Sequence, residues 1–88
     1  MKKFTMRCGY IAYKATFLDT MFIGGFGICD ECGAIPTEGY LVPVLNHYQC
    51  PGCFREFEEH AKYYPEDLWF ERKISEYWEK MIPLDEGW

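Results

Sequence analysis

The chain of 88 residues contains no apolar run that approaches the ~18 residues of a membrane-spanning helix. Its N-terminal stretch mixes lysine, arginine and polar residues with single apolar ones, so it lacks both the hydrophobic segment and the cleavage site of a signal peptide. Linkers and low-complexity segments are missing as well. These absences predict a cytoplasmic protein that makes no contact with a membrane, in which residues 1–88 form a single domain.

Histidine is scarce, and the chain has only His47 and His60. We expect each to be a surface or partly buried residue rather than a metal ligand or a catalytic base. The glycines at positions 24, 25 and 27 lack the GxxxxGK[ST] pattern of a phosphate-binding loop, so they predict a bend instead. Adjacent carboxylates such as Glu58 and Glu59 diverge on a helix and predict a solvated face. We therefore expect that the protein is not an enzyme.

Basic residues are also few, because nine lysines and arginines stand against 14 aspartates and glutamates, for a formal net charge of −5. Residues 1–28 carry +3 and residues 29–88 carry −8. An acidic body repels a phosphate backbone, which disfavours nucleic-acid binding. The alternative function, a nucleic-acid-binding zinc protein, rests on the N-terminal segment, where basic and aromatic residues interleave in a way that suits base stacking. The residues of this segment are Lys2, Lys3, Phe4, Arg7, Tyr10, Tyr13 and Lys14.

Apolar side chains are plentiful: hydrophobic residues make up 49% of the chain and aromatic residues 19%. This composition indicates a folded core rather than a disordered chain. A domain of this length buries only ~60–65% of the surface that its unfolded chain exposes. A bound metal ion is therefore expected to support the fold.

Two CxxC pairs are the most specific motifs in the chain: CDEC at positions 29–32 and CPGC at positions 50–53. The seventeen residues 33–49 separate them, which is within the range of zinc modules. In a reducing compartment such pairs are metal ligands more often than disulfides. They predict one Zn²⁺, with iron as a less favoured occupant. The predicted ligands are Cys29, Cys32, Cys50 and Cys53. Four thiolates leave no coordination position for water, so the site is expected to be structural rather than catalytic.

The stretch from residue 29 to residue 64 resembles a treble clef, in which a zinc knuckle and a β-hairpin precede a second ligand pair at the first turn of a helix. The knuckle would be residues 29–33 and the hairpin about residues 39–49. A zinc ribbon or a rubredoxin uses similar knuckles, but there the second pair is followed by a turn into another strand. Here the second pair is followed by FREFEE, which favours a helix. The resemblance is to an architecture rather than to one named family.

The predicted fold class is α+β, with N-terminal strands, the zinc knuckle, a hairpin and two C-terminal helices. Partial alternation of apolar residues predicts strands in residues 1–28, including a short strand at 20–23. Cys8 shares the apolar parity of this segment, so we expect a small buried residue on a strand rather than a fifth ligand or a reactive thiol. Proline at position 65, followed by two acidic residues, predicts the start of a helix that runs from about residue 66 to 82.

The C-terminal helix carries aromatic residues on more than one side, and a small core cannot enclose all of them. Exposed aromatic patches are typical of interfaces. We therefore predict a protein-interaction or regulatory module that contacts a protein partner or a second copy of itself. The aromatic residues concerned are Trp69, Phe70, Tyr77, Trp78 and Trp88. The small size and acidity also suit an inhibitor encoded by a phage or mobile element, which would occupy the basic groove of a nucleic-acid enzyme.

Overall fold

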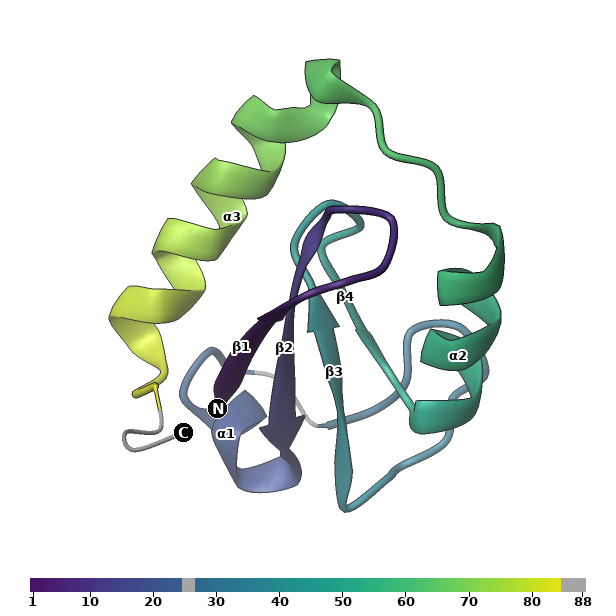
Figure 1. The fold of residues 1–88 in the computed structure, drawn as a ribbon. Coiled ribbons are helices and arrows are strands. Elements are labelled where there is room, and N and C mark those ends of the chain that lie inside the picture. Colours follow the sequence, from purple (N-terminus) through teal and green to yellow (C-terminus); the bar gives the residue numbers. More distant parts are fainter. Residues whose placement is uncertain (25–26, 85–88) are drawn as a thin grey trace.

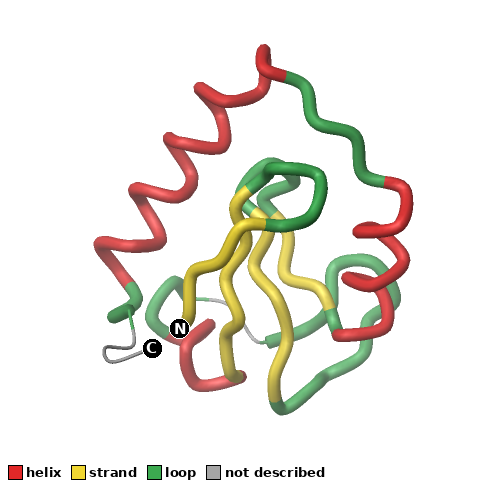
Figure 2. The backbone as a smooth tube through the Cα atoms, viewed as in Figure 1, coloured by secondary structure: helices red, strands yellow, loops and turns green. Residues whose placement is uncertain are grey.

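The computed structural model describes residues 1–24 and 27–84, which form one four-stranded antiparallel sheet with helices on both of its faces (Figures 1 and 2). The strands follow one another in the sheet in chain order. They are β1 (Lys2–Thr5), β2 (Ile11–Thr16), β3 (Glu38–Val42) and β4 (His47–Gln49). The helices are α1 (Phe17–Met21), α2 (Pro51–His60), the 3₁₀ turn η1 (Pro65–Asp67) and α3 (Leu68–Met81). The predicted α+β class and its C-terminal helices are confirmed.

The first hairpin joins β1 to β2 through a tight turn that contains the fifth cysteine. The turn is closed by hydrogen bonds from the Met6 N–H to the Tyr10 carbonyl (2.7 Å) and from the Gly9 N–H to the Met6 carbonyl (3.0 Å). Gly9 adopts a φ of +112°, which a residue with a side chain rarely adopts. The placement of Cys8 on a strand was therefore wrong: β1 ends at Thr5, and Cys8 is a half-buried turn residue. The alternation of apolar residues continues from β1 through this turn without a break. Gly9 is the residue in the sequence that indicates the turn.

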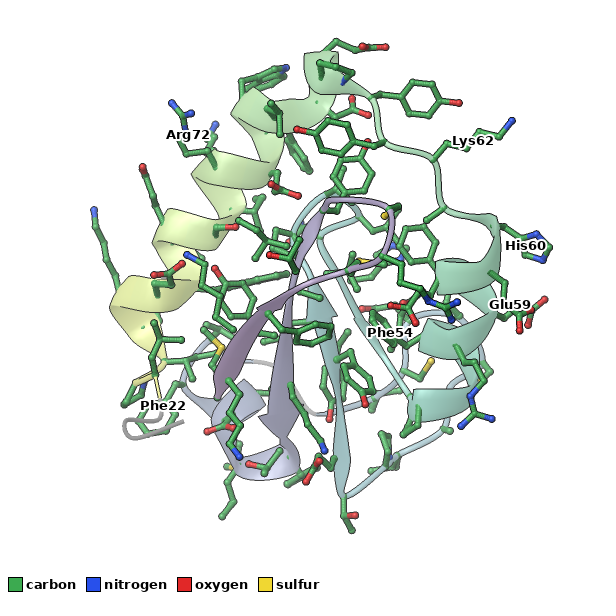
Figure 3. The ribbon with its side chains drawn as sticks, viewed as in Figure 1. Phe22, Phe54, Glu59, His60, Lys62 and Arg72 are labelled. Carbon is green, nitrogen blue, oxygen red and sulfur yellow. The ribbon has the colours of Figure 1, made fainter. Side chains whose placement is uncertain are left out.

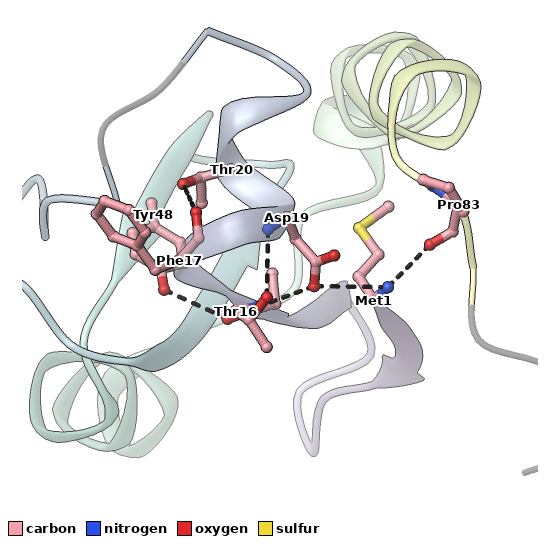
Figure 4. A network of polar contacts seen from close by, with 8 residues as sticks. Met1, Thr16, Phe17, Asp19, Thr20, Tyr48 and Pro83 are labelled. Atoms are coloured by element: carbon pink, nitrogen blue, oxygen red, sulfur yellow. Dashed lines mark hydrogen bonds and ion pairs between the residues drawn. The ribbon is translucent and has the colours of Figure 1, made fainter.

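The predicted strand at residues 20–23 is also wrong, because this stretch belongs to α1 and the turn after it. A capping box begins the helix: the Asp19 N–H donates to Thr16 Oγ1 (3.2 Å), and the Thr16 N–H donates to the Asp19 carboxylate (2.9 Å). The Thr20 hydroxyl then donates to the Phe17 carbonyl at 2.6 Å (Figure 4). These local hydrogen bonds outweigh the strand preference of the apolar residues that follow.

The second hairpin and the helices after it match their predicted positions. Tyr40 pairs with Gln49 and Leu41 with Tyr48 in the β3–β4 ladder. The strand ends at Val42 because the following proline has no N–H to donate. Residues 43–46 form the turn, and α2 begins directly after Cys50. The 3₁₀ turn and α3 together cover residues 65–81, close to the predicted helix.

Two separate cores lie on the two faces of the sheet, which is why β2 is buried on both sides. On one face, a cluster packs beneath α3; its buried members are Met1, Tyr13, Ala15, Leu41, Tyr48, Trp78 and Ile82. On the other face, a second cluster packs beneath α2; its buried members are Met6, Tyr10, Ala12, Val42 and Phe54. The two helices lie on opposite sides of the sheet in Figure 1, and Phe54 points from α2 toward the strands in Figure 3. The rings of Phe54 and Tyr40 stack at a centroid distance of 4.1 Å.

The C-terminal aromatic residues divide between the core and the surface. Trp78 is only 4% exposed and its ring meets the edge of Tyr13 at 6.3 Å, so its prediction as an interface residue is corrected: it is a core residue. Trp69 and Tyr77 are 68% and 51% exposed. Phe70 is half-buried and contacts the ring of Trp69. Trp88, and Gly25 of the glycine bend, lie outside the described residues.

Carboxylates anchor α3 to the first hairpin. Glu71 is buried and accepts a hydrogen bond from the Ile11 N–H (3.0 Å). Glu79 accepts from the Tyr13 hydroxyl and from the Lys3 ammonium (2.9 Å). Two partners of Glu79 therefore come from a strand pair more than sixty positions away in the sequence.

The amino group of Met1 joins the end of α3 to α1. It donates to the Pro83 carbonyl at 2.8 Å and lies 3.7 Å from the Asp19 carboxylate (Figure 4). Among the described residues, no helix has the length and the apolar character that crossing a membrane requires.

Candidate metal centre

The four predicted ligand cysteines come together at one end of α2. All four sulfur atoms lie within 4.8 Å of one another, and the Cys32 and Cys50 sulfurs are 3.7 Å apart. A tetrahedral zinc site with Zn–S distances of about 2.3 Å has sulfur–sulfur separations of ~3.8 Å. The cluster therefore fits a single tetrahedral metal ion. No other group of three or more metal-binding side chains meets this condition in residues 1–24 and 27–84.

The first pair sits on a knuckle whose backbone folds around the sulfurs. The Cys29 N–H donates to the Ala34 carbonyl (2.7 Å), and the Gly33 N–H donates back to the Cys29 carbonyl (2.9 Å). Gly33 has a φ of +79°, as expected for the residue that turns the chain away from the knuckle. Cys29 is buried and Cys32 is exposed, so the cluster spans the boundary between the protein interior and the solvent.

The second pair lies at the start of α2, where Cys50 is the N-cap and Cys53 belongs to the first turn. Pro51 occupies a first-turn position, at which its missing N–H costs no hydrogen bond. Thiolates gathered around one divalent ion leave a net negative charge. The unpaired N–H groups and the positive end of the helix dipole stabilise that charge.

Backbone N–H groups also favour ionisation of the innermost sulfur. Burial raises the pKa of the Cys29 thiol, but N–H groups of Cys50, Cys32 and Glu31 outweigh burial and bring this pKa down to about 6. In contrast, the neighbouring thiols, that of Cys50 foremost, raise the pKa of Cys53 far above its ordinary value. Four crowded thiols do not all ionise by themselves at neutral pH, so a cation is what makes the fully ionised set stable.

Two side chains of the knuckle attach it to the second hairpin, and the sequence analysis did not single them out. The Asp30 N–H donates to the Tyr48 carbonyl, and the Tyr48 N–H donates to the Asp30 carboxylate, both at 2.8 Å. Glu31 lies 3.0 Å from His47 Nδ1. The signal in the sequence for these contacts is the pair of acidic residues inside the first CxxC motif. The sequence does not show which strand they contact.

The two histidines stay outside the cluster, as expected. His47 contacts Glu31, and His60 is exposed at the end of α2, where it points away from the sheet (Figure 3). In the basic and aromatic N-terminal segment, two of the three aromatic side chains belong to the cores, and the third, Phe4, is partly buried. Tyr10 and Tyr13 are buried, and Lys3 and Lys14 pair with carboxylates at 2.9 and 2.7 Å.

No protein-family model, no curated protein and no solved structure matches this chain.

Proposed function

We propose that the cysteine cluster holds one Zn²⁺ and that the ion has a structural role in a treble-clef-like module. The observation that supports zinc is the donor set: four thiolates at tetrahedral spacing, which suit zinc better than harder cations, with iron as the less favoured occupant. The ion would join the knuckle to the first turn of α2. Because all four positions are taken by sulfur, we expect no catalysis at this site and no enzymatic activity.

We further propose that this zinc-supported domain is a cytoplasmic protein-interaction module. The observation that carries this proposal is the set of large apolar side chains that remain exposed although the chain has two cores to place them in. Leu18, Met21 and Phe22, in or just after α1, are 69%, 58% and 54% exposed. Trp69 and Tyr77 of α3 are exposed to a similar degree. Exposed apolar surface of this kind is typical of interfaces.

The acidity of the protein suggests the nature of its partner. A formal net charge of −5 favours a basic partner over a second copy of the chain. An inhibitor that covers the basic groove of a nucleic-acid enzyme, encoded by a phage or a mobile element, is one role that fits this chemistry.

Native mass spectrometry of freshly purified protein tests both proposals at once. One zinc per chain supports the structural site, whereas a mass reduced by four hydrogens without metal would mean two disulfides and would overturn it. The same spectra give the oligomeric mass.

Affinity capture then compares wild-type protein with Leu18→Ser and with Lys62→Ser, a surface control in the exposed segment after α2. A partner that the leucine variant loses and the lysine variant retains supports the interaction role. Loss from both variants or from neither would refute the assignment to this surface.

A further inference from the structure

A cavity of about 500 Å³ opens on the face of the sheet beneath α3. The buried aromatic residue Trp78 and the two hairpin residues Leu41 and Tyr48 contribute apolar surface to it. The α3 residue Tyr77 and the knuckle approach, with Ile28, provide further walls. Its volume is in the range of sites that enclose a sizeable ligand group. The cavity is distinct from the cysteine cluster, although the knuckle borders both.

Among the described residues that line this cavity, one is charged, and it is acidic. Asp30 contributes its carboxylate, of which one oxygen accepts the Tyr48 N–H at 2.8 Å. Its other oxygen accepts no hydrogen bond from residues 1–24 and 27–84. Asp30 is itself exposed, so its carboxylate lies on the solvent side of the cavity. Among the described lining residues there is no lysine or arginine to neutralise it, so a cationic group from a partner is its electrostatic complement.

Three aromatic residues share the lining of this cavity with Asp30: Tyr48, Tyr77 and Trp78. Aromatic rings beside a carboxylate are a favourable environment for an ammonium or guanidinium group, whose methylene stem packs against the rings.

A partner protein suits this cavity better than a small molecule or a second copy does. Ile28 and Tyr77 line the cavity but are themselves 43% and 51% exposed, so a ligand confined to the cavity would leave apolar surface uncovered. A second copy would bring another net charge of −5 to an acidic wall. A basic segment with apolar flanking residues satisfies both conditions.

We propose that this cavity receives a lysine or arginine side chain from a basic, apolar-flanked segment of a partner protein, with the cationic group at Asp30 and the stem against Tyr77 and Trp78. The inference rests on the proposed interaction function and names the chemistry of the partner. It places the recognition of charge on the knuckle and the recognition of apolar surface on α3.

The test is a titration of ¹⁵N-labelled, zinc-loaded protein with four peptides, Ac-Leu-X-Leu-NH₂, in which X is lysine, arginine, norleucine or glutamate. We expect the lysine and arginine peptides to shift the Trp78 indole and the backbone amides around the cavity, with dissociation constants on the order of 1 mM. Norleucine, which keeps the lysine stem without its charge, should bind at least fivefold more weakly, and glutamate should not bind. Added salt should weaken the cationic peptides alone.

Matched variants locate the binding. Asp30→Asn keeps an acceptor for the Tyr48 N–H but loses the charge, and it should weaken lysine binding roughly tenfold. Glu66→Gln removes the same charge from an exposed position outside the cavity and should have no effect. Tyr77→Ala should weaken binding, whereas Trp69→Ala, on the same helix but outside the cavity, should not. Amide dispersion and zinc content confirm that each variant is folded.

Three outcomes would overturn the inference: equal binding of the norleucine peptide, shifts confined to other surfaces, or no shifts well above ~1 mM peptide. Its failure is distinguishable from failure of the interaction role. If Leu18→Ser loses a partner while the peptides leave the cavity unchanged, the interaction role stands and this assignment falls.

Discussion

Replacing Cys32 by serine is the most direct test of how much the metal contributes to stability. Cys32 is exposed, whereas Cys29 is buried, so serine at position 32 removes a metal ligand without a large loss of core packing. An 88-residue domain has a typical free energy of unfolding of about 4–13 kcal/mol. Structural zinc binds cysteine-rich peptides with about 10–16 kcal/mol, and equal division among four ligands gives each about 2.5–4 kcal/mol. The substitution should therefore remove a large part of the total stability.

In thermal unfolding followed by circular dichroism, this loss corresponds to a melting temperature lower by roughly 10–30 °C. The matched control is Cys8→Ser, which makes the same atomic change in the turn between β1 and β2, outside the cluster, and should cost less than about 1 kcal/mol. A chelator should destabilise the wild type and the Cys8 variant much more than the Cys32 variant. If the melting temperature and zinc content of Cys32→Ser equal those of the wild type, the four-thiolate reasoning is wrong.

Three further predictions concern the two cores and the sheet. Burial raises the pKa of Glu79, but its hydrogen bonds outweigh burial and lower this pKa overall. The carboxylate should therefore stabilise the fold above the pKa of the unfolded chain, and this contribution should disappear as the pH falls through the folded value. In urea titrations between neutral and acid pH, the free energy of unfolding of Glu79→Gln should fall less steeply than that of the wild type. Trp78→Ala should cost about 3–5 kcal/mol and Trp69→Ala less than about 0.5 kcal/mol in the same urea assay, and similar values would contradict the assigned burial. Gly39→Ala should destabilise the fold, since the added Cβ would lie 2.6 Å from a backbone oxygen of β4. Gly52→Ala adds a Cβ with nothing within 4 Å and should raise the free energy of unfolding by about 0.5–1 kcal/mol. Melting temperatures of the two variants that move in the same direction would refute this contrast.

The elements that the sequence predicts well are those whose signals are local. The spacing of the two CxxC pairs predicts the cluster, and Gly33 predicts the turn out of the knuckle. Proline at position 65 and the two acidic residues after it predict the start of the C-terminal helix, and the predicted range, 66–82, covers all of α3. In each case the residues that carry the signal also make the local structure, so no knowledge of distant contacts is needed.

The errors arise where a distant contact or a polar cap decides the outcome. Residues 20–23 have strand-forming side chains, but the hydrogen bonds between Thr16 and Asp19 begin a helix. The signal for this cap in the sequence is a threonine followed three positions later by an aspartate. Trp78 differs, because its burial depends on contact with Tyr13 of β2, which is distant in the sequence. A helix with aromatic residues on several sides does not show which of them faces inward.

The contact between the knuckle and β4 has a consequence for association. In the order β1-β2-β3-β4, β4 is an outer strand, and such a strand offers unpaired backbone groups to any other chain that comes near. Asp30 occupies both the N–H and the carbonyl of Tyr48, so the knuckle shields the middle of this three-residue strand. If the cluster holds a metal ion as we propose, release of that ion would loosen the knuckle and uncover this edge. The proposed ion would then protect against edge-to-edge aggregation of the sheet as well as against unfolding.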